Sequence, residues 1–229
     1  MTAKGAEMSS RTLPRLQTTH EWAREEIRHR IVSGLYAPGA LLKQTEIAEE
    51  LDISVTPVRE AMRDLVGEGL VTMKSQRIAH VCDADPDAAV EINEMRLLLE
   101  PLAARRAAER AAAADVLRMR ELAAVAEEAA VAMDHAGWVS GNHEFHVAII
   151  DSARSPRLAA TLRNLRQIST FYLGIAVREN RAILGKGIEE HRALIDAIEA
   201  RDGERAAAIM RHHLLPSASV AAHAALSPR

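Results

Sequence analysis

The sequence contains little cysteine and few aromatic residues. Among its 229 residues there is one cysteine, Cys82, and aromatic residues make up 3% of the chain. A single cysteine excludes an intrachain disulfide and gives no indication of an oxidising compartment. The chain also lacks an apolar run of the roughly 20 residues that a membrane-spanning helix requires, and its first residues lack the apolar core of a signal peptide. We therefore expect a cytoplasmic protein without a membrane partner.

An excess of positive charge is also absent. The formal net charge is −3 at pH 7, and residues 11–82 contain ten Lys and Arg against ten Asp and Glu. Composition therefore leaves DNA binding undecided, because a DNA-binding face would need its positive charge gathered on one side. The length allows one or two domains with buried cores, and the scarcity of aromatic residues beside abundant alanine favours helices.

The first third of the chain carries the pattern of three helices followed by two strands. The expected elements are helices at 19–34, 44–51 and 55–67 and strands at 70–74 and 78–82. In the first helix, the residues at helical spacing are Trp22, Ile27, Ile31 and Leu35. Ser54 is the expected N-cap of the third helix. The two strands flank Ser75-Gln76-Arg77, which predicts a two-stranded wing.

The remainder of the chain is predicted to be helical, without strands. The expected helices run over 87–113, 115–134, 138–153 and 156–183, then to Ala200, and finally from Asp202 to about residue 215. Gly137 is expected to separate two of them, and Pro101 could kink the first. The flanking segments are a flexible arm at 1–18, a linker at 83–86 and a tail at 217–229. The predicted fold class is mainly α: an N-terminal winged helix-turn-helix at 19–82 and a C-terminal all-α helical bundle at 87–216.

The helix expected at 55–67 has two different faces. Val58, Ala61, Met62 and Leu65 share an apolar face, while Thr56, Arg59 and Arg63 lie opposite. Arginine can bind guanine through two hydrogen bonds, and hydroxyl groups bind bases or phosphates. Further contacts to the DNA backbone could come from Lys43, Thr45, Gln76 and Arg77. From spacing alone, an ordinary solvated amphipathic helix is an equal alternative.

Residues 31–71 resemble the DNA-binding domain of the GntR superfamily. The matching features are Ile31 to Gly34, Pro38-Gly39, Leu42, Ile47-Ala48 to Leu51, Ser54, Pro57-Val58-Arg59-Glu60-Ala61, Leu65 and Gly69-Leu70-Val71. The resemblance implies that DNA is read by Ser54, Val55, Thr56 and Arg59, with Arg77 in the wing. The family has glycine at the wing tip, where this chain has Ser75-Gln76. That difference puts insertion of the wing into the minor groove in doubt.

Several histidines have the spacing of a metal site. Asn142 and His146 are four residues apart and so share one helix face, while His191 and His213 lie on two further helices. If these helices pack around one axis, an amide oxygen and three imidazoles can converge on a divalent metal. Zinc suits such donors, and so do nickel, copper and iron. The alternative is that these are ordinary solvated or core residues among the ten histidines of the chain.

Residues 87–216 resemble the FCD-type effector domain of the FadR-like branch, with the six helices of its VanR-like subgroup. The matching features are Glu94-Met95-Arg96-Leu97-Leu98-Leu99-Glu100, Asn142-His143-Glu144-Phe145-His146, Glu190-His191 and Met210-Arg211-His212-His213-Leu214. The resemblance implies a metal, zinc before nickel, held by Asn142, His146, His191 and His213. Aspartate is common in the family at the first of these positions, and asparagine is a weaker donor. The resemblance favours His213 over His212, and His143 is not expected to be a ligand.

Neutral ligands would leave the charge of a metal uncancelled, so the cavity should attract an anion. We expect a small organic acid as effector, clamped by Arg96, with Arg163 and Arg166 as further candidates. The expected mechanism is that of a homodimeric repressor on a near-palindromic operator, whose DNA affinity changes by linkage when the acid binds. Two alternatives remain open: a metal-dependent hydrolase with Glu190 as the nearest general base, and a metal-free interaction module.

Overall fold

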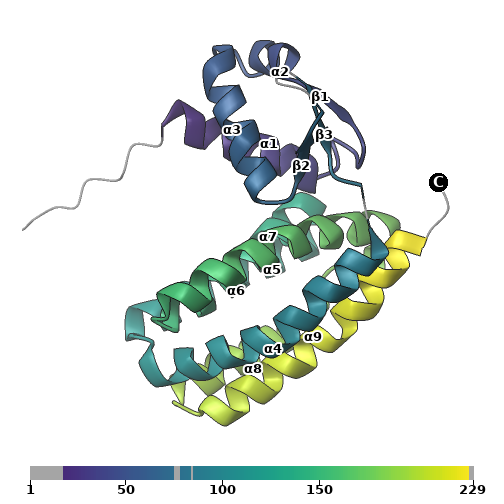
Figure 1. The fold of residues 1–229 in the computed structure, drawn as a ribbon. Coiled ribbons are helices and arrows are strands. Elements are labelled where there is room, and N and C mark those ends of the chain that lie inside the picture. The colour runs from purple at the N-terminus through teal and green to yellow at the C-terminus, as the bar shows by residue number, and fades with distance from the viewer. Residues whose placement is uncertain (1–17, 75–77, 84, 227–229) are drawn as a thin grey trace, which may run out of the picture.

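The computed structural model describes residues 18–226 except for residues 75–77 and 84. Residues 1–17 of the arm expected at 1–18 and the two wing candidates Gln76 and Arg77 lie outside the described residues. The described chain forms two parts, a small head and a larger bundle of helices below it (Figure 1). The head comprises residues 18–82, and the helical domain begins at Pro86.

The head is a winged helix-turn-helix, as predicted. Its helices are α1 (Thr19–Val32), α2 (Gln44–Glu50) and α3 (Val55–Gly67), and its strands are β1 (Leu41–Lys43), β2 (Val71–Met73) and β3 (Ile78–Val81). The strands form an antiparallel sheet in the order β1-β3-β2. Strand β1 was not expected from the sequence. It has three residues and is defined by pairing with β3, for example Leu42 opposite Ala79, a contact that no local pattern reveals.

The core of the head is made by one face of α1 and one face of α3. Ile27 and Ile31 of α1 and Met62 of α3 are fully buried. The first helix begins with a capping box in which Thr18 accepts from the Glu21 backbone N–H and the Glu21 side chain accepts from that of Thr18. The helical spacing of Trp22 and Leu35 is misleading, because these side chains are 40% and 70% exposed. Ala23 instead completes the buried face, and α1 ends before Leu35.

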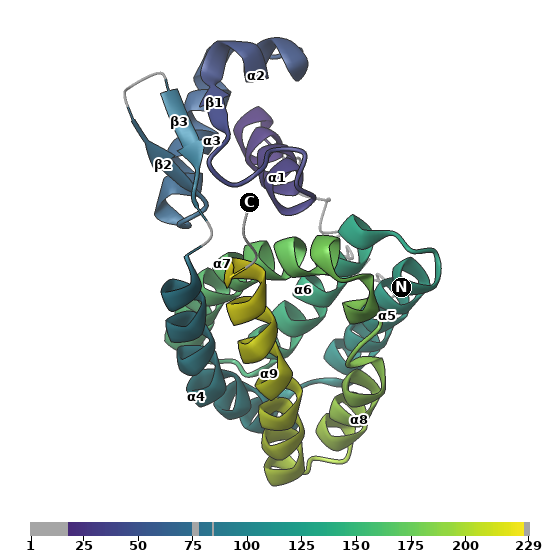
Figure 2. The ribbon, with the colours of Figure 1, turned by 90° about the vertical axis from the view of Figure 1, so that its right-hand side faces the viewer.

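The helical domain contains six α-helices in its described part, as the sequence predicts. They are α4 (Pro86–Arg110), α5 (Ala113–Val131), α6 (His135–Ser152), α7 (Pro156–Glu179), α8 (Ile188–Glu199) and α9 (Gly203–Leu226), with the short 3-10 helix η1 (Arg181–Ile183) before α8. Figure 2 shows them arranged around a common interior, with α7 close to the head. Within the described residues, no helix is long and apolar enough to cross a membrane.

The structure differs from the prediction at Gly137 and at the end of the last helix. Gly137 does not separate helices but lies in the first turn of α6, where its backbone N–H donates to Asp134, the N-cap residue. The last helix does not end near residue 215 but continues past Pro216 to Leu226. An internal proline removes only one backbone donor, and the alanine-rich segment that follows has high helix propensity.

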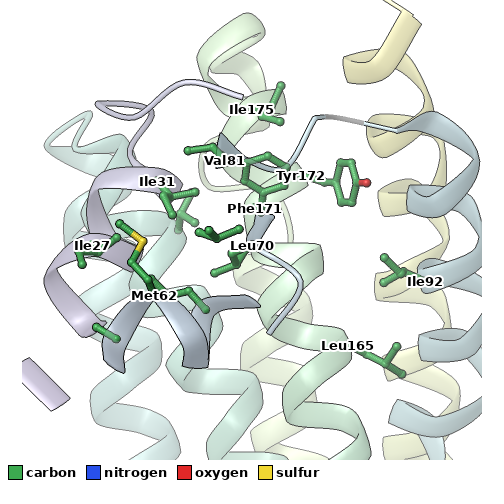
Figure 3. Packing of buried hydrophobic residues seen from close by; sticks show 14 of the residues in the cluster. Ile27, Ile31, Met62, Leu70, Val81, Ile92, Leu165, Phe171, Tyr172 and Ile175 are labelled. Atoms are coloured by element: carbon green, nitrogen blue, oxygen red, sulfur yellow. The ribbon is translucent and has the colours of Figure 1, made fainter. Parts of the chain in front are cut away.

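Helix α7 joins the helical domain to the head. Phe171 and Ile175 of α7 belong to the same hydrophobic cluster as Ile31 and Leu70 of the head (Figure 3). Glycine is required at position 174, because a Cβ there would lie 2.4 Å from the Val32 carbonyl oxygen at the end of α1. The head is therefore packed directly on α7.

Candidate functional site

The outer face of α3 has the properties of a DNA-reading surface. Its apolar residues face the head core, which leaves the opposite face exposed: Ser54, Val55, Thr56, Arg59 and Arg63. Ser54 is the N-cap residue, as expected, but its side chain makes no capping hydrogen bond. Outside α3, Lys43 and Thr45 are also exposed, and the Lys43 ammonium lies 2.7 Å from the Glu46 carboxylate. The described residues thus present two hydroxyl groups, from the N-cap and the first turn of α3, and two guanidinium groups from its exposed face.

Three of the four expected metal ligands converge inside the helical domain. The Nε2 atoms of His146 (α6) and His213 (α9) are 3.2 Å apart, and the Nε2 atoms of His191 (α8) and His213 are 3.4 Å apart. The three rings come together because α8 packs against α9 and α6 faces the same interior of the bundle. Asn142 lies one helical turn before His146 and is buried beside the same interior.

Two carboxylates determine which ring nitrogens carry protons. The Nδ1 atom of His146 lies 3.1 Å from Oε2 of Glu100, and Nδ1 of His213 lies 2.9 Å from Oε2 of Glu190. A carboxylate can only accept, so each Nδ1 donates and each Nε2 carries a lone pair. The lone pairs of His146 and His213 therefore point toward one another, and two acceptors cannot form a hydrogen bond.

The histidine cluster is electrically neutral. Burial lowers the pKa of His146 well below its usual value, and the positive charge of Arg166 acts in the same direction. Burial also lowers the pKa values of His191 and His213. Metal ions bind the neutral form of imidazole, so the rings are in the form that coordination requires.

The geometry of the cluster fits a metal ion. Nitrogen ligands at the usual distance from a tetrahedral zinc ion lie about 3.3–3.4 Å from one another. The two Nε2 separations at His213 are 3.2 and 3.4 Å. Hydrogen bonds from the far nitrogens to carboxylates are the usual arrangement around histidine ligands. The ligand atoms of all three histidines lie within 4.8 Å of one another, so these residues could together hold a divalent ion.

Glu100 is the centre of a buried ionic network. Its Oε1 accepts from Nε of Arg96 at 2.6 Å and lies 3.7 Å from Nη1 of Arg166, while Oε2 binds His146. Burial alone raises the pKa of the Glu100 carboxyl, but the attraction of the two arginines outweighs burial and holds the pKa well below its usual range. Burial in turn lowers the pKa of Arg166 to about 9. Arg166 therefore remains charged at neutral pH.

A cavity of about 530 Å³ adjoins the histidine cluster. Its wall includes Asn142, His213 and both buried arginines, Arg96 and Arg166. Arg96 is less available than expected, because Nε binds Glu100 and Nη1 binds the Ser169 hydroxyl. These bonds use two of the five N–H donors of Arg96, so a two-point clamp on an acid would have to come from the other three.

The structure does not bring Arg163 to this cavity. Its side chain is 49% exposed and pairs with Asp151 at 2.5 Å. Arg163 lines a second cavity of about 250 Å³, between α1, α6 and α7, where His143 also lies. The Arg163 side chain points outward from α7, whereas the Arg166 side chain, three residues later, is buried in the interior. The prediction that Arg163 belongs to the histidine-lined cavity is therefore wrong.

Sequence reasoning missed two features of the site. Glu100 was noticed only as the end of a matching segment, although its position four residues after Arg96 places both on one helix face. Gly187 is the second: a Cβ there would lie 2.5 Å from Cε1 of His213. Its positive φ of 88° and its missing side chain let the start of α8 approach that ring.

Two domain families match the chain. Residues 19–81 match the bacterial regulatory proteins of the gntR family, and residues 91–215 match the FCD domain. The chain is 29% identical over 196 residues to the galactonate operon transcriptional repressor of Escherichia coli K12, a match that covers 77% of this chain and 85% of that protein. It is 28% identical over 200 residues to the HTH-type transcriptional repressor GlaR of the same organism, with coverage of 82% and 89%.

A solved structure shares the whole fold. The structure of McbR/YncC from E. coli superposes with a TM-score of 0.80 at 24% identity and covers 90% of this chain and 98% of that one. A regulator from Rhodococcus sp. RHA1 superposes with a TM-score of 0.74 at 22% identity, covering 92% and 99%. The exposed recognition helix, the winged head and the FCD-type bundle thus occur together in one polypeptide, and the chain belongs to the GntR family of DNA-binding transcription regulators that carry an FCD domain.

Proposed function

We propose that this protein is a homodimeric repressor that releases its operator when a small carboxylic acid binds beside a divalent metal in the helical domain. The observation that carries the proposal is the pair of facing Nε2 lone pairs on His146 and His213, 3.2 Å apart, in a buried site. Lone pairs so placed repel one another unless a cation lies between them. The two relatives named above are repressors, which supports the same sign of regulation here.

The metal would be held by His146, His191 and His213, with the Asn142 amide oxygen as a fourth donor. A bound divalent ion would supply positive charge and an open coordination position for a carboxylate oxygen. Zinc is the first candidate, and nickel is the second. Arg96 and Arg166 add positive charge to the same cavity, so an anion is the ligand that the wall favours.

Operator binding would use two heads related by twofold symmetry. A dimer presents one α3 helix to each half of a near-palindromic site. Support for a second copy comes from α4, on which Leu98 is 78% exposed and Met95 36% exposed. Apolar side chains at such positions are buried when two copies associate.

Helix α7 is the proposed link between the acid and the DNA. Arg166, Ser169 and Thr170 on one face of α7 line the cavity, and Phe171 and Ile175 pack on the head. An acid that displaces one partner of Arg96, such as Ser169, would shift α7 against the end of α1. Because Gly174 is already in close contact with Val32, such a shift moves the head rather than being absorbed locally.

The hydrolase alternative is not supported. The expected general base, Glu190, accepts hydrogen bonds from Nδ1 of His213 at 2.9 Å and Nδ1 of His212 at 2.8 Å. Those bonds orient a proposed metal ligand and leave the carboxylate engaged. The relatives named above are transcription regulators.

Metal content tests the proposed site. Purified protein is expected to contain one divalent ion per chain, measured by inductively coupled plasma mass spectrometry, and to lose it to a strong chelator. His213→Ala should reduce the stoichiometry to near zero, because it removes the ligand that lies close to both other Nε2 atoms. The adjacent His212→Ala is the matched control, since its side chain is 75% exposed, and should retain the metal. Equal metal content in both variants would contradict this ligand assignment.

A further inference from the structure

The cavity beside the histidine cluster contains buried polar atoms that have no partner among the described residues. They are Nδ2 and Oδ1 of Asn93, Nε1 of Trp138 and Nε of Arg166. Each of the three residues is only 3% exposed, and all three line the 530 Å³ cavity. Leaving such groups unpaired costs stability, so each of them requires a partner such as an ordered water, an ion or a ligand.

Asn93 and Trp138 lie along α4 and α6 at increasing distance from the histidine cluster. Glu100 of α4 touches His146 of α6, and one turn back along each helix lie Arg96 and Asn142. A further turn back along the same helices lie Asn93 and Trp138. Two turns of helix advance about 11 Å. An acid anchored near the histidines would therefore extend along the cavity toward Asn93 and Trp138.

The unpaired atoms indicate what the rest of that acid must carry. The indole N–H of Trp138 and the Nε–H of Arg166 can only donate, so they require oxygen acceptors. The Asn93 amide has both a free donor and a free acceptor, and its Oδ1 requires a donor on the ligand. A carboxylate cannot donate, and an ammonium group would be repelled by Arg96 and Arg166. A hydroxyl group satisfies both sides of the amide.

We propose that the effector is a hydroxy acid, and that Asn93 and Trp138 determine specificity by binding its hydroxyl groups. This inference rests on the proposed function, because it assumes a carboxylate bound beside the histidines. It adds that the protein binds the corresponding acid without hydroxyl groups more weakly. Sites that hydrogen-bond a ligand hydroxyl discriminate strongly against the analogue that lacks it, because the buried protein groups are then left unpaired.

Calorimetric titration of the metal-loaded protein with matched acids tests this proposal. The pairs are L-malate with succinate and gluconate with hexanoate, whose members differ only in hydroxyl groups. For at least one pair, the hydroxylated member is expected to bind at least tenfold more tightly. In Asn93→Leu this preference should fall below threefold, while the affinity for the unsubstituted acid stays the same. Asn164→Leu, at an exposed asparagine of α7, and Trp22→Phe are controls that should keep the preference, whereas Trp138→Phe should reduce it.

The outcomes separate the two claims. Equal binding of both members in every pair overturns the hydroxy-acid inference and leaves the carboxylate effector standing. Binding of no acid overturns the proposed effector, and the inference with it. A second measurement needs no ligand: Asn93→Leu should raise the Tm of the acid-free protein by about 2–4 °C, because it removes an unpaired buried amide. A fall in Tm would show that the amide serves the fold, and would overturn its assignment to a ligand.

Discussion

Glu100→Gln is expected to destabilise the helical domain by about 3–5 kcal/mol. The Glu100 carboxylate is 1% exposed and pairs with Arg96 and Arg166, which are 4% and 3% exposed. Removing its charge leaves two buried guanidinium groups without their counter-charge. For a chain of this size, the expected fall in Tm is roughly 10 °C or more, measurable by calorimetry or by circular dichroism.

An exposed ion pair provides the matched control for Glu100→Gln. Glu127 pairs with Arg192 at 2.5 Å, but the two side chains are 38% and 60% exposed. Surface pairs of this kind contribute less than about 1 kcal/mol. Glu127→Gln should therefore change Tm by about 2 °C at most. If both variants were equally stable, the Glu100 network would not stabilise the fold as its burial implies.

Arg59→Ala is expected to reduce operator affinity by about 1–3 kcal/mol for each half-site. Arg59 projects from the exposed face of α3, one turn after Thr56, where a guanidinium can reach the edge of a base. In a dimer both half-sites lose the contact, so the combined loss is on the order of a hundredfold or more. Fluorescence anisotropy should use a duplex that the protein itself has selected from random DNA.

Specificity and salt dependence distinguish base reading from general attraction. If Arg59 reads a base, the Arg59→Ala variant should lose much more affinity for the selected duplex than for random duplexes. A phosphate contact would instead weaken both duplexes equally and lower the salt dependence of binding. Arg118→Ala, at an arginine of α5 that is 58% exposed, is the control and should bind as the unmodified protein does. Unchanged affinity in Arg59→Ala would contradict the assignment of α3 as the reading helix.

The helices and their faces could be predicted from the sequence because the signals are local. The bounds of α3 follow from the spacing of Val58, Met62 and Leu65 and from Gly67 at its end. The convergence of the histidines was predictable because Asn142 and His146 share a helix face and because two further histidines lie in segments that match a known family. Strand β1 was not predictable, since it exists only through its pairing with β3.

The wall of the cavity depends on contacts that no local pattern encodes. Glu100 and His146 are 46 residues apart in the chain, and their contact depends on how α4 packs against α6. The same packing brings Asn93 and Trp138 to one cavity, although each resembles an ordinary core position in the sequence. The sequence alone could not show which of the two arginine side chains, Arg163 or Arg166, points from α7 into the cavity. Local periodicity thus predicts elements, whereas the chemistry of the site requires the tertiary structure.

We propose that an acid bound beside the histidine cluster changes the affinity of the head for DNA. The most direct test is a titration of the selected duplex with metal-loaded protein, with and without a saturating acid from the matched pairs. We predict that an acid that binds the protein weakens DNA binding at least tenfold, and that removing the metal by chelation abolishes this effect. If such an acid left DNA affinity unchanged, the cavity and the head would not be coupled, which would contradict the proposed release of the operator.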